Sequence, residues 1–230
     1  MDFAPFDKRG YPMVAARVGY AEWAADYEAT VAASLDQPLL ERLTSPAWIK
    51  FITAVDLACG TGRTGLWLAQ RGVRHIDGVD ATSEMLEIAR TKNVYRDLHL
   101  ADVAATALRS SKYDLCTMVL ADEHLVGLKQ VYREAARLIS HQGNFVLVGY
   151  HPFFLMNGVP THFHRPNGEA VAIESHIHLF SEHFQAGVDA GLMLIEFREC
   201  IIDERWLLTK PKWRKYLNWP VSFALVWKRS

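Results

Sequence analysis

The sequence has few cysteines, little net charge and no long apolar run. Its three cysteines, Cys59, Cys116 and Cys200, stand far apart, which fits neither a disulfide framework nor a zinc site of paired cysteines. The 25 basic and 26 acidic residues leave a formal net charge of -1, so the whole protein has no electrostatic preference for nucleic acid or anionic membranes. We therefore expect a reducing, cytoplasmic environment, with no nucleic-acid and no membrane partner.

No segment of the sequence is expected to be a signal peptide or a transmembrane helix. The first ten residues, MDFAPFDKRG, lack the apolar stretch that a signal peptide needs. The long stretch 142–164 has no Asp, Glu, Lys or Arg and contains Pro152 and Pro160, which do not suit a membrane span. With 230 residues, 50% of them hydrophobic and 22% charged, the chain has the composition of one globular domain.

Hydrophobic periodicity predicts helices and strands that alternate along most of the chain. Helices are expected first over 19–35 and 38–43, because apolar residues there recur every three or four positions. The alternation that follows comprises strands 51–58, 75–80, 93–101, 113–121 and 144–150, and helices 64–70, 83–90 and 125–138. Strands that alternate with helices at this spacing form a parallel sheet with right-handed crossovers.

The pattern changes after residue 150. Residues 151–180 are rich in Pro, Gly, His and Phe, and a helix over 181–190 and strands over 192–203 and 221–228 follow. With no helix expected between them, the last two strands must pair as a hairpin, so one runs antiparallel. The predicted fold is a single-domain α/β protein with a doubly wound, mostly parallel seven-stranded sheet and a terminal antiparallel strand. An N-terminal helical segment (1–50) precedes the main domain (51–230), which carries the insert 151–180.

A glycine-rich turn follows the first buried strand. Gly60-Thr-Gly62-Arg-Thr-Gly65 matches G-x-G-x-x-G, and Asp80 comes 80 − 62 = 18 residues after Gly62. Glycines let a nucleotide approach the backbone, and a carboxylate at the end of the second strand can accept hydrogen bonds from a ribose diol. This motif alone leaves an NAD(P)-dependent oxidoreductase open as an alternative.

Two further acids favour a cationic ligand over a pyrophosphate. Asp56 lies at the end of the first strand, four residues before Gly60, where its carboxylate would repel a phosphate at the helix N-terminus. Asp102 closes the third strand at the same sheet edge. Any one of these aspartates could be a helix cap or a turn residue, but three in register with a glycine turn suit an adenosine that carries a positively charged amino acid.

These motifs together resemble those of class I S-adenosylmethionine-dependent methyltransferases, in the branch that acts on small molecules. The segments that carry the resemblance lie in order between Tyr20 and Tyr150: Val55-Asp-Leu-Ala-Cys-Gly-Thr-Gly62, Gly78-Val-Asp80, Ser83-Glu-Met-Leu86, Ala101-Asp102-Val103, Tyr113-Asp114 and Glu123-His-Leu125. The resemblance implies a Rossmann-like methyltransferase fold, S-adenosylmethionine as cofactor and a small-molecule methyl acceptor.

The resemblance also implies residue roles. In the glycine turn, the methionine part of the cofactor would contact Asp56, Ala58, Gly60, Thr61 and Gly62. The ribose, the adenine and the sulfonium would contact Asp80, Ala81, Met85, Asp102, Val103, Val119 and Leu120. Ala58 stands where many members have glycine, which is tolerable if its φ is not positive.

The N-terminal aromatic residues have two interpretations. Tyr20, Trp23 and Tyr27 share one helix face and can be simply the buried side of a packing helix. Similar methyltransferases use an aromatic segment at this place as a lid, in which Tyr20 and Tyr27 would cover the cofactor and Trp23 would reach the acceptor pocket.

Methyl transfer from a sulfonium is an in-line displacement that depends on alignment in a dry pocket and needs a base only for a protonated acceptor. Glu123 and His124, at the mouth of the fourth strand, are the candidate bases, and His151 at the start of the insert is another. The alternative is that Asp122-Glu-His124 only caps the following helix.

Histidine is over-represented, with ten in the chain and six of them between 151 and 183. The expected acceptor pocket draws on this region and comprises Trp23, Phe153, His162, His164, His176 and His178. His162 and His164, and likewise His176 and His178, would share a strand face, so a metal site is conceivable, but no carboxylate or cysteine is closely spaced with them and no metal is expected. Hydrogen-bonded structural histidines are the favoured alternative.

The segment from Lys210 to Trp219 interleaves basic and aromatic residues, a pattern that can bind RNA or simply form a solvated loop. A catalytically inactive binding module that keeps the cofactor site is a further alternative for the whole protein. The sequence indicates no oligomeric state.

Overall fold

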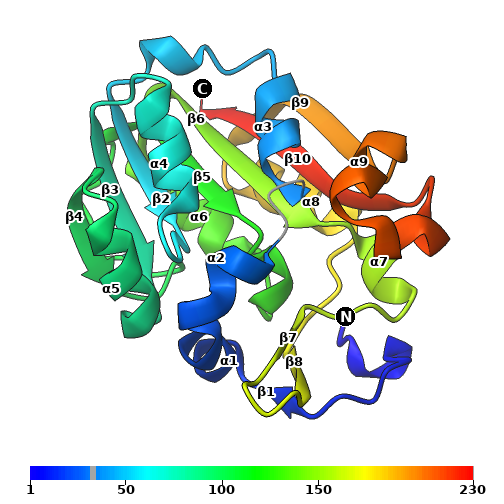
Figure 1. Ribbon diagram of the computed structural model, residues 1–230. Helices are drawn as coiled ribbons and strands as arrows, with labels where there is room; N and C mark the ends of the chain where they lie inside the picture. Colours follow the sequence, from blue (N-terminus) through cyan, green and yellow to red (C-terminus); the bar gives the residue numbers. More distant parts are fainter. Residues whose placement is uncertain (32–34, 230) are drawn as a thin grey trace.

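The computed structural model describes residues 1–31 and 35–229, and a seven-stranded sheet forms its centre (Figure 1). The strand order is β4–β3–β2–β5–β6–β10–β9. The strands are β2 (Thr53–Leu57), β3 (His75–Asp80), β4 (Tyr95–Leu100), β5 (Tyr113–Val119), β6 (Ile139–Tyr150), β9 (Leu192–Ile201) and β10 (Pro220–Arg229). Only β10 runs against its neighbours, β6 and β9, within this sheet. The predicted fold class is confirmed.

Helices cover both faces of the sheet, as the doubly wound pattern requires. Helices α3 (Gln37–Arg42), α4 (Arg63–Gln70) and α9 (Glu204–Thr209) pack into one core, and α6 (Lys129–Leu138) and α8 (Phe180–Asp189) pack into the other. In Figure 1, α3 and α4 lie in front of the sheet and α6 and α8 lie behind it. Strand residues alternate between the cores, so Val146 and Val148 enter the first while Leu147 enters the second. Helix α5 (Ser83–Thr91) covers β3 and β4.

The structure corrects several element predictions. Helix α6 begins at Lys129 and not at residue 125, because residues Asp122–His124 form a separate 3-10 turn, η5. Between β9 and β10, where no helix was expected, lie α9 and a 3-10 turn, η6 (Pro211–Tyr216). Helix α9 forms because the Asp203 carboxylate accepts a hydrogen bond from the Trp206 N–H at 2.9 Å, and because Trp206 and Leu207 are buried. The two strands still pair antiparallel.

The N-terminal segment and the insert meet in a second, three-stranded sheet. Strand β1 (Met13–Val14) pairs parallel with β8 (Ala170–Ile173), which pairs antiparallel with β7 (His162–His164). Figure 1 shows this sheet beside α1 (Ala16–Trp23), away from the main sheet. The insert also contains a short helix, α7 (Pro152–Met156).

The predicted N-terminal helix is divided into three consecutive helical elements. After α1 come a 3-10 turn, η2 (Ala24–Asp26), and α2 (Tyr27–Thr30), while residues 32–34 of the predicted helix lie outside the described residues. Two more 3-10 turns, η1 (Ala4–Phe6) and η4 (Trp48–Lys50), lie in the first fifty residues. In the described ranges, no helix combines the length and the apolar character needed to cross a membrane.

Candidate active site

The turn between β2 and α4 has an unusual backbone. Ala58, Gly60 and Gly62 all have positive φ, at 52°, 52° and 88°. The condition under which alanine would be tolerable at position 58 is thus not met, and an alanine in this region carries roughly 1–2 kcal/mol of strain. A Cβ built on Gly60 would meet no atom within 4 Å, so the backbone of the turn borders open space.

Asp56 lies beneath this turn and not in the space above it. Its carboxylate accepts hydrogen bonds from the Thr117 hydroxyl at 2.7 Å and the Tyr95 hydroxyl at 2.8 Å. Burial raises the pKa of Asp56 to about 6. Gly65 is needed for the same cluster, because a Cβ there would come within 2.3 Å of the Tyr95 hydroxyl. The Asp56 carboxylate, predicted to contact a ligand, thus supports the turn from below in the structure.

A cavity of about 280 Å³, here called the donor cavity, opens above the turn. Asp80 is 8% exposed at its edge, and its two carboxylate oxygens accept hydrogen bonds from the backbone N–H of Gly60 and of Thr82, both at 2.8 Å. The predicted cofactor residues that line this cavity are Tyr20, Tyr27, Ala58, Gly60, Thr61, Asp80, Ala81, Met85, Asp102, Val103, Val119 and Leu120. Asp56 and Gly62 are not among the lining residues.

The donor cavity also has polar residues that the sequence predictions missed. They include Arg17, Asp36, Arg63 and Thr64. The Arg63 guanidinium lies 3.1 Å from the carboxylate of Asp36, which is buried and also caps α3. A signal for Arg63 was available, because it stands inside the glycine motif between Gly62 and Gly65, whereas nothing in the sequence placed residue 36 nearby.

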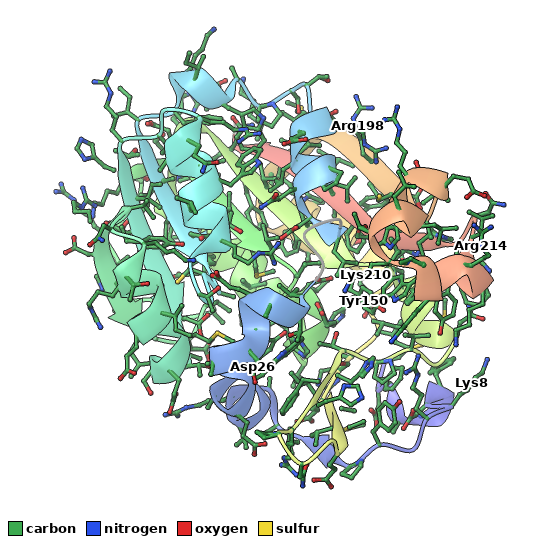
Figure 2. All side chains as sticks on the ribbon, in the orientation of Figure 1. Lys8, Asp26, Tyr150, Arg198, Lys210 and Arg214 are labelled. Atoms are coloured by element: carbon green, nitrogen blue, oxygen red, sulfur yellow. The ribbon has the colours of Figure 1, made fainter. Side chains whose placement is uncertain are left out.

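A second cavity of about 380 Å³, here called the acceptor cavity, adjoins the first. Tyr20, Tyr27 and Leu120 line both cavities and therefore form their common boundary. Of the predicted pocket residues, Trp23, His162 and His164 line the acceptor cavity, as does Glu123. The lining residues that were missed include Asp26, Tyr150, Thr161, Lys210 and Trp213, and Figure 2 shows Tyr150 and Lys210 between α2 and the C-terminal helices.

The other predicted pocket residues lie elsewhere and have structural contacts. Phe153 is 39% exposed and packs against Trp219 outside the cavity. His176 forms an isolated backbone bridge with Asp2. His178 is buried, with its Nε2 atom 2.8 Å from the carbonyl oxygen of Leu125. The contacts of His176 and His178 are therefore those of structural histidines, and Phe153 packs on the surface.

His151 has two structural partners and lines neither cavity. Its Nδ1 atom accepts a hydrogen bond from the Phe153 N–H at 3.1 Å, which caps α7, and its Nε2 atom lies 2.8 Å from a Glu199 carboxylate oxygen. The sequence placed this residue among the candidate bases because it begins the insert. The structure turns its ring toward Glu199 of β9, and His151 is not among the residues at the shared boundary of the cavities.

Glu123 and His124, from turn η5, lie where the two cavities meet, and His124 has both ring nitrogens occupied. Its Nδ1 atom lies 2.8 Å from the Glu174 carbonyl oxygen, which can only accept, so Nδ1 carries the proton. Nε2 then accepts a hydrogen bond from the Tyr20 hydroxyl at 2.8 Å. Burial raises the pKa of Tyr20 well above its usual value, which keeps this hydroxyl protonated as a donor.

Glu123 has one free carboxylate oxygen. Oε1 accepts a hydrogen bond from the Thr161 hydroxyl at 3.2 Å and lies 3.6 Å from His124 Nε2, whereas Oε2 is buried without a partner among the described residues. The side chain is 3% exposed, and burial raises the pKa of Glu123 to about 7. Of the candidate bases, Glu123 alone combines a free oxygen with a place in the acceptor cavity.

Two other groupings lie away from these cavities. The side chains of Asp77, Asp97 and His99 lie close enough together to hold a metal ion. Asp77, however, already forms ion pairs with Arg96 and Lys112 and accepts a hydrogen bond from the Tyr113 hydroxyl. In the segment from Lys210 to Trp219, the aromatic rings turn inward: Trp213 stacks on Phe154 at 5.5 Å and Tyr216 is buried. These rings do not form the exposed stacking platform that RNA binding requires.

Comparison with known proteins shows which family of domains contains a matching glycine turn and matching strands. A family model described as a methyltransferase domain matches residues 55–147, and solved structures of S-adenosylmethionine-dependent methyltransferases share the fold. The chain carries a methyltransferase domain over residues 55–147. The match decides against the NAD(P)-dependent alternative.

The relatives of this methyltransferase domain resemble only part of the chain. A protein named methyltransferase-like protein 27 from Homo sapiens is 33% identical over 98 residues, which are 40% of this chain and 39% of that protein. An uncharacterized methyltransferase, YcgJ, from Bacillus subtilis (strain 168) is 28% identical over 102 residues, 42% of this chain and 40% of that protein. The chain thus matches about two fifths of the length of these curated relatives.

A solved structure matches over a longer range. The S-adenosylmethionine-dependent methyltransferase from Mesorhizobium loti has a TM-score of 0.68 and 19% identity, over 86% of this chain and 99% of that one. This likeness shows the fold. The family match covers much of the donor cavity, whereas most residues of the acceptor cavity lie before residue 36 or after residue 149. The part of the chain that matches the family model therefore includes much of the donor cavity and little of the acceptor cavity.

Proposed function

We propose that the protein transfers a methyl group from S-adenosylmethionine to a small molecule in the acceptor cavity. The observation that carries this proposal is the shared boundary of the two cavities, formed by Tyr20, Tyr27 and Leu120. A donor in one cavity and an acceptor in the other would meet at this boundary. Holding two reactants in line at close range supplies most of the acceleration that a methyl transfer needs.

The donor cavity has groups that fit S-adenosylmethionine. Asp80 uses its carboxylate oxygens on two backbone N–H groups and keeps further lone pairs for the ribose hydroxyls. Open space beside Gly60 admits the methionine part, and Arg63 lines the cavity as a cation for its carboxylate. The exposed Asp102 is available to the adenine amino group, with Met85 and Val103 as apolar walls. When bound, this group supplies an electrophilic methyl on a positively charged sulfur.

The N-terminal segment, residues 1–50, would act as a lid over both reactants. Tyr20 and Tyr27 border both cavities, and Trp23 lines the acceptor cavity and stacks on Phe163 of β7 at 5.6 Å. The contact ties the lid to the insert 151–180, which forms the opposite wall. A closed aromatic cover excludes water and keeps the acceptor aligned.

Proton transfer would fall to Glu123 and not to His124. The free Oε2 of Glu123 can take a proton, and a pKa of about 7 suits a base that works near neutral pH. His124 would have to release the Tyr20 hydroxyl before it could accept a proton. In this scheme, His124 and Tyr20 are positioning residues.

The direct test is calorimetry with S-adenosylhomocysteine and with NAD, followed by methyl transfer from a labelled donor to a panel of small molecules. We expect S-adenosylhomocysteine to bind, NAD not to bind, and at least one acceptor to be labelled. Failure of S-adenosylhomocysteine to bind would overturn the proposal. Binding without any labelled product would favour an inactive module that has kept only the cofactor site.

The three cysteines support a reducing, cytoplasmic location as part of the proposal. Cys59, Cys116 and Cys200 are all buried and unpaired. A fluorescent fusion of the full chain tests this location, and accumulation in an oxidising compartment would contradict it.

A further inference from the structure

The acceptor cavity offers hydrogen-bond acceptors to its occupant. Glu123 lines the cavity, and its Oε2 atom is buried without a hydrogen-bond partner among the described residues. A buried carboxylate oxygen without a donor is costly, and the cost is removed when a ligand supplies an N–H or O–H group. The occupant should therefore carry a donor at the position next to Glu123.

His162 adds a second acceptor to the same cavity. Its Nδ1 atom lies 2.8 Å from the carbonyl oxygen of Pro160, so Nδ1 must donate. Burial lowers the pKa of His162, which keeps the ring neutral and leaves Nε2 as an acceptor. His124 cannot supply an N–H to the cavity either, because Nδ1 donates to Glu174 and Nε2 accepts from Tyr20.

Aromatic rings line the cavity around these acceptors. Trp23 contacts Tyr27 edge to face, with ring centroids 4.9 Å apart, and stacks on Phe163. Tyr150 and Trp213 complete the aromatic lining. The negative faces of such rings attract a cation, most strongly where water is excluded.

The charged residues around the cavity also favour a cationic ligand. Asp26 and Glu123 are lining carboxylates, and Lys210 is the one lysine or arginine that lines the cavity among the described residues. Lys210 is partly buried, and its Nζ atom lies 3.4 Å from the Thr30 carbonyl oxygen. A carboxylate or phosphate ligand would meet like charge at Glu123.

We propose that the methyl acceptor is a small amine, bound with its nitrogen against Glu123 and its carbon skeleton among the aromatic rings. This inference rests on the proposed function and gives the substrate class for it. An ammonium enters and transfers one proton to the Glu123 carboxylate, which exposes the nitrogen lone pair. The lone pair forms the new N–CH₃ bond while the S–CH₃ bond breaks and its electron pair stays on sulfur.

The products of this step balance. They are a methylated ammonium, a neutral thioether and a protonated Glu123, which returns its proton to solvent. The positive charge moves from sulfur to nitrogen, toward the aromatic rings and away from the donor cavity. The acceptor cavity thus stabilises the charge that develops during the reaction.

The test compares molecules that differ only in their polar group. Calorimetry with saturating S-adenosylhomocysteine measures the affinities of benzylamine, 2-phenylethylamine and butylamine, each beside the corresponding alcohol and carboxylate. We expect at least one amine to bind about ten-fold to a hundred-fold more tightly than its alcohol, and the carboxylates not to bind. Equal or tighter binding of the alcohols or carboxylates, or no binding of any amine, would overturn the inference.

A variant locates the effect at one side chain. Glu123→Gln keeps the size of the group and removes its charge, so amine affinity should fall by about ten-fold or more while alcohol affinity stays nearly constant. Glu87→Gln, on the exposed face of α5, is the matched control and should change neither. An unchanged amine affinity in Glu123→Gln would contradict the inference, and the wild-type series remains decisive if this variant fails to fold.

The two proposals fail in different ways. If S-adenosylhomocysteine does not bind the wild-type protein, the proposed function is wrong. If it binds and the amines do not, the methyltransferase function stands and only the amine class is wrong.

Discussion

The Tyr20 hydroxyl donates a hydrogen bond to Nε2 of His124 over 2.8 Å, across 104 residues of sequence. The rings also contact edge to face, with centroids 5.2 Å apart. Helix α1 is thereby connected to turn η5, which follows the carboxyl end of β5. The orientation of His124 next to Glu123 therefore depends on the N-terminal segment.

Tyr20→Phe should separate this hydrogen bond from the packing of the ring. The phenyl ring keeps its contacts with Trp23 and Tyr27, but His124 Nε2 loses its donor, which should lower the free energy of unfolding by about 1–3 kcal/mol. Urea unfolding measures the change. Tyr11→Phe, which removes a hydroxyl bonded to Arg9 outside both cavities, is the control, and an equal loss there would remove the special role of Tyr20.

Asp80→Asn should weaken binding of S-adenosylhomocysteine. An amide has one accepting oxygen, so its NH₂ group would face the N–H of Gly60 or of Thr82, and the ribose would lose a charged acceptor. We expect calorimetry to show a loss of about ten-fold or more, equivalent to about 1.4 kcal/mol for each factor of ten. Asp97→Asn, an exposed substitution on β4, should leave the affinity unchanged. Wild-type affinity in Asp80→Asn would contradict the ribose assignment.

Ala58→Gly should leave stability unchanged or raise it by up to about 1 kcal/mol. The φ of +52° is unfavourable for alanine by roughly 1–2 kcal/mol, and glycine relieves this strain while adding freedom to the unfolded chain. Ala54→Gly in the buried strand β2 is the control, where the same change should destabilise the protein. Equal losses in chemical unfolding of the two variants would show that Ala58 is not strained.

Buried His183 should make the protein sensitive to acid. Burial lowers its pKa to about 3, whereas the unfolded value is near 6.5, so its contribution to stability is present above about pH 6.5 and is lost as the pH falls toward 3. Between about pH 7.5 and pH 5, wild type should lose about 1–2 kcal/mol more than His183→Gln, which keeps an acceptor for the Tyr132 hydroxyl.

The measurement for His183 is urea unfolding at both pH values. His141→Gln, at an exposed position of β6, serves as the control and should follow wild type. A His183→Gln variant that loses as much stability as wild type would show that this imidazole does not drive the acid response.

The sheet was predictable because burial on both faces produces short, continuous apolar strands separated by helices with a different period. Strand β2 and the glycine turn after it follow from residues 51–65 alone. Helix α9 was missed because its stability comes from the burial of Trp206 and Leu207 against distant parts of the chain, which a local pattern does not contain.

The side-chain partners within the site were harder to predict. The residues around Asp56 do not indicate whether its carboxylate contacts a ligand or the hydroxyls of Thr117 and Tyr95, because those two residues lie far along the chain. The spacing of His162 and His164 predicts a shared strand face but not what that face meets. Glu123 and His124 could not be ranked from sequence, because the difference lies in the carbonyl of Glu174 and the hydroxyl of Tyr20.

The parallel pairing of β1 with β8 has a consequence for synthesis on the ribosome. Residues 13–14 cannot pair with residues 170–173 until these have left the exit tunnel. Trp213 of the acceptor cavity emerges later still. The glycine turn and the strands beside it emerge much earlier, within residues 53–119. The nascent chain can therefore assemble its nucleotide side first, and the acceptor side is completed near the end of translation.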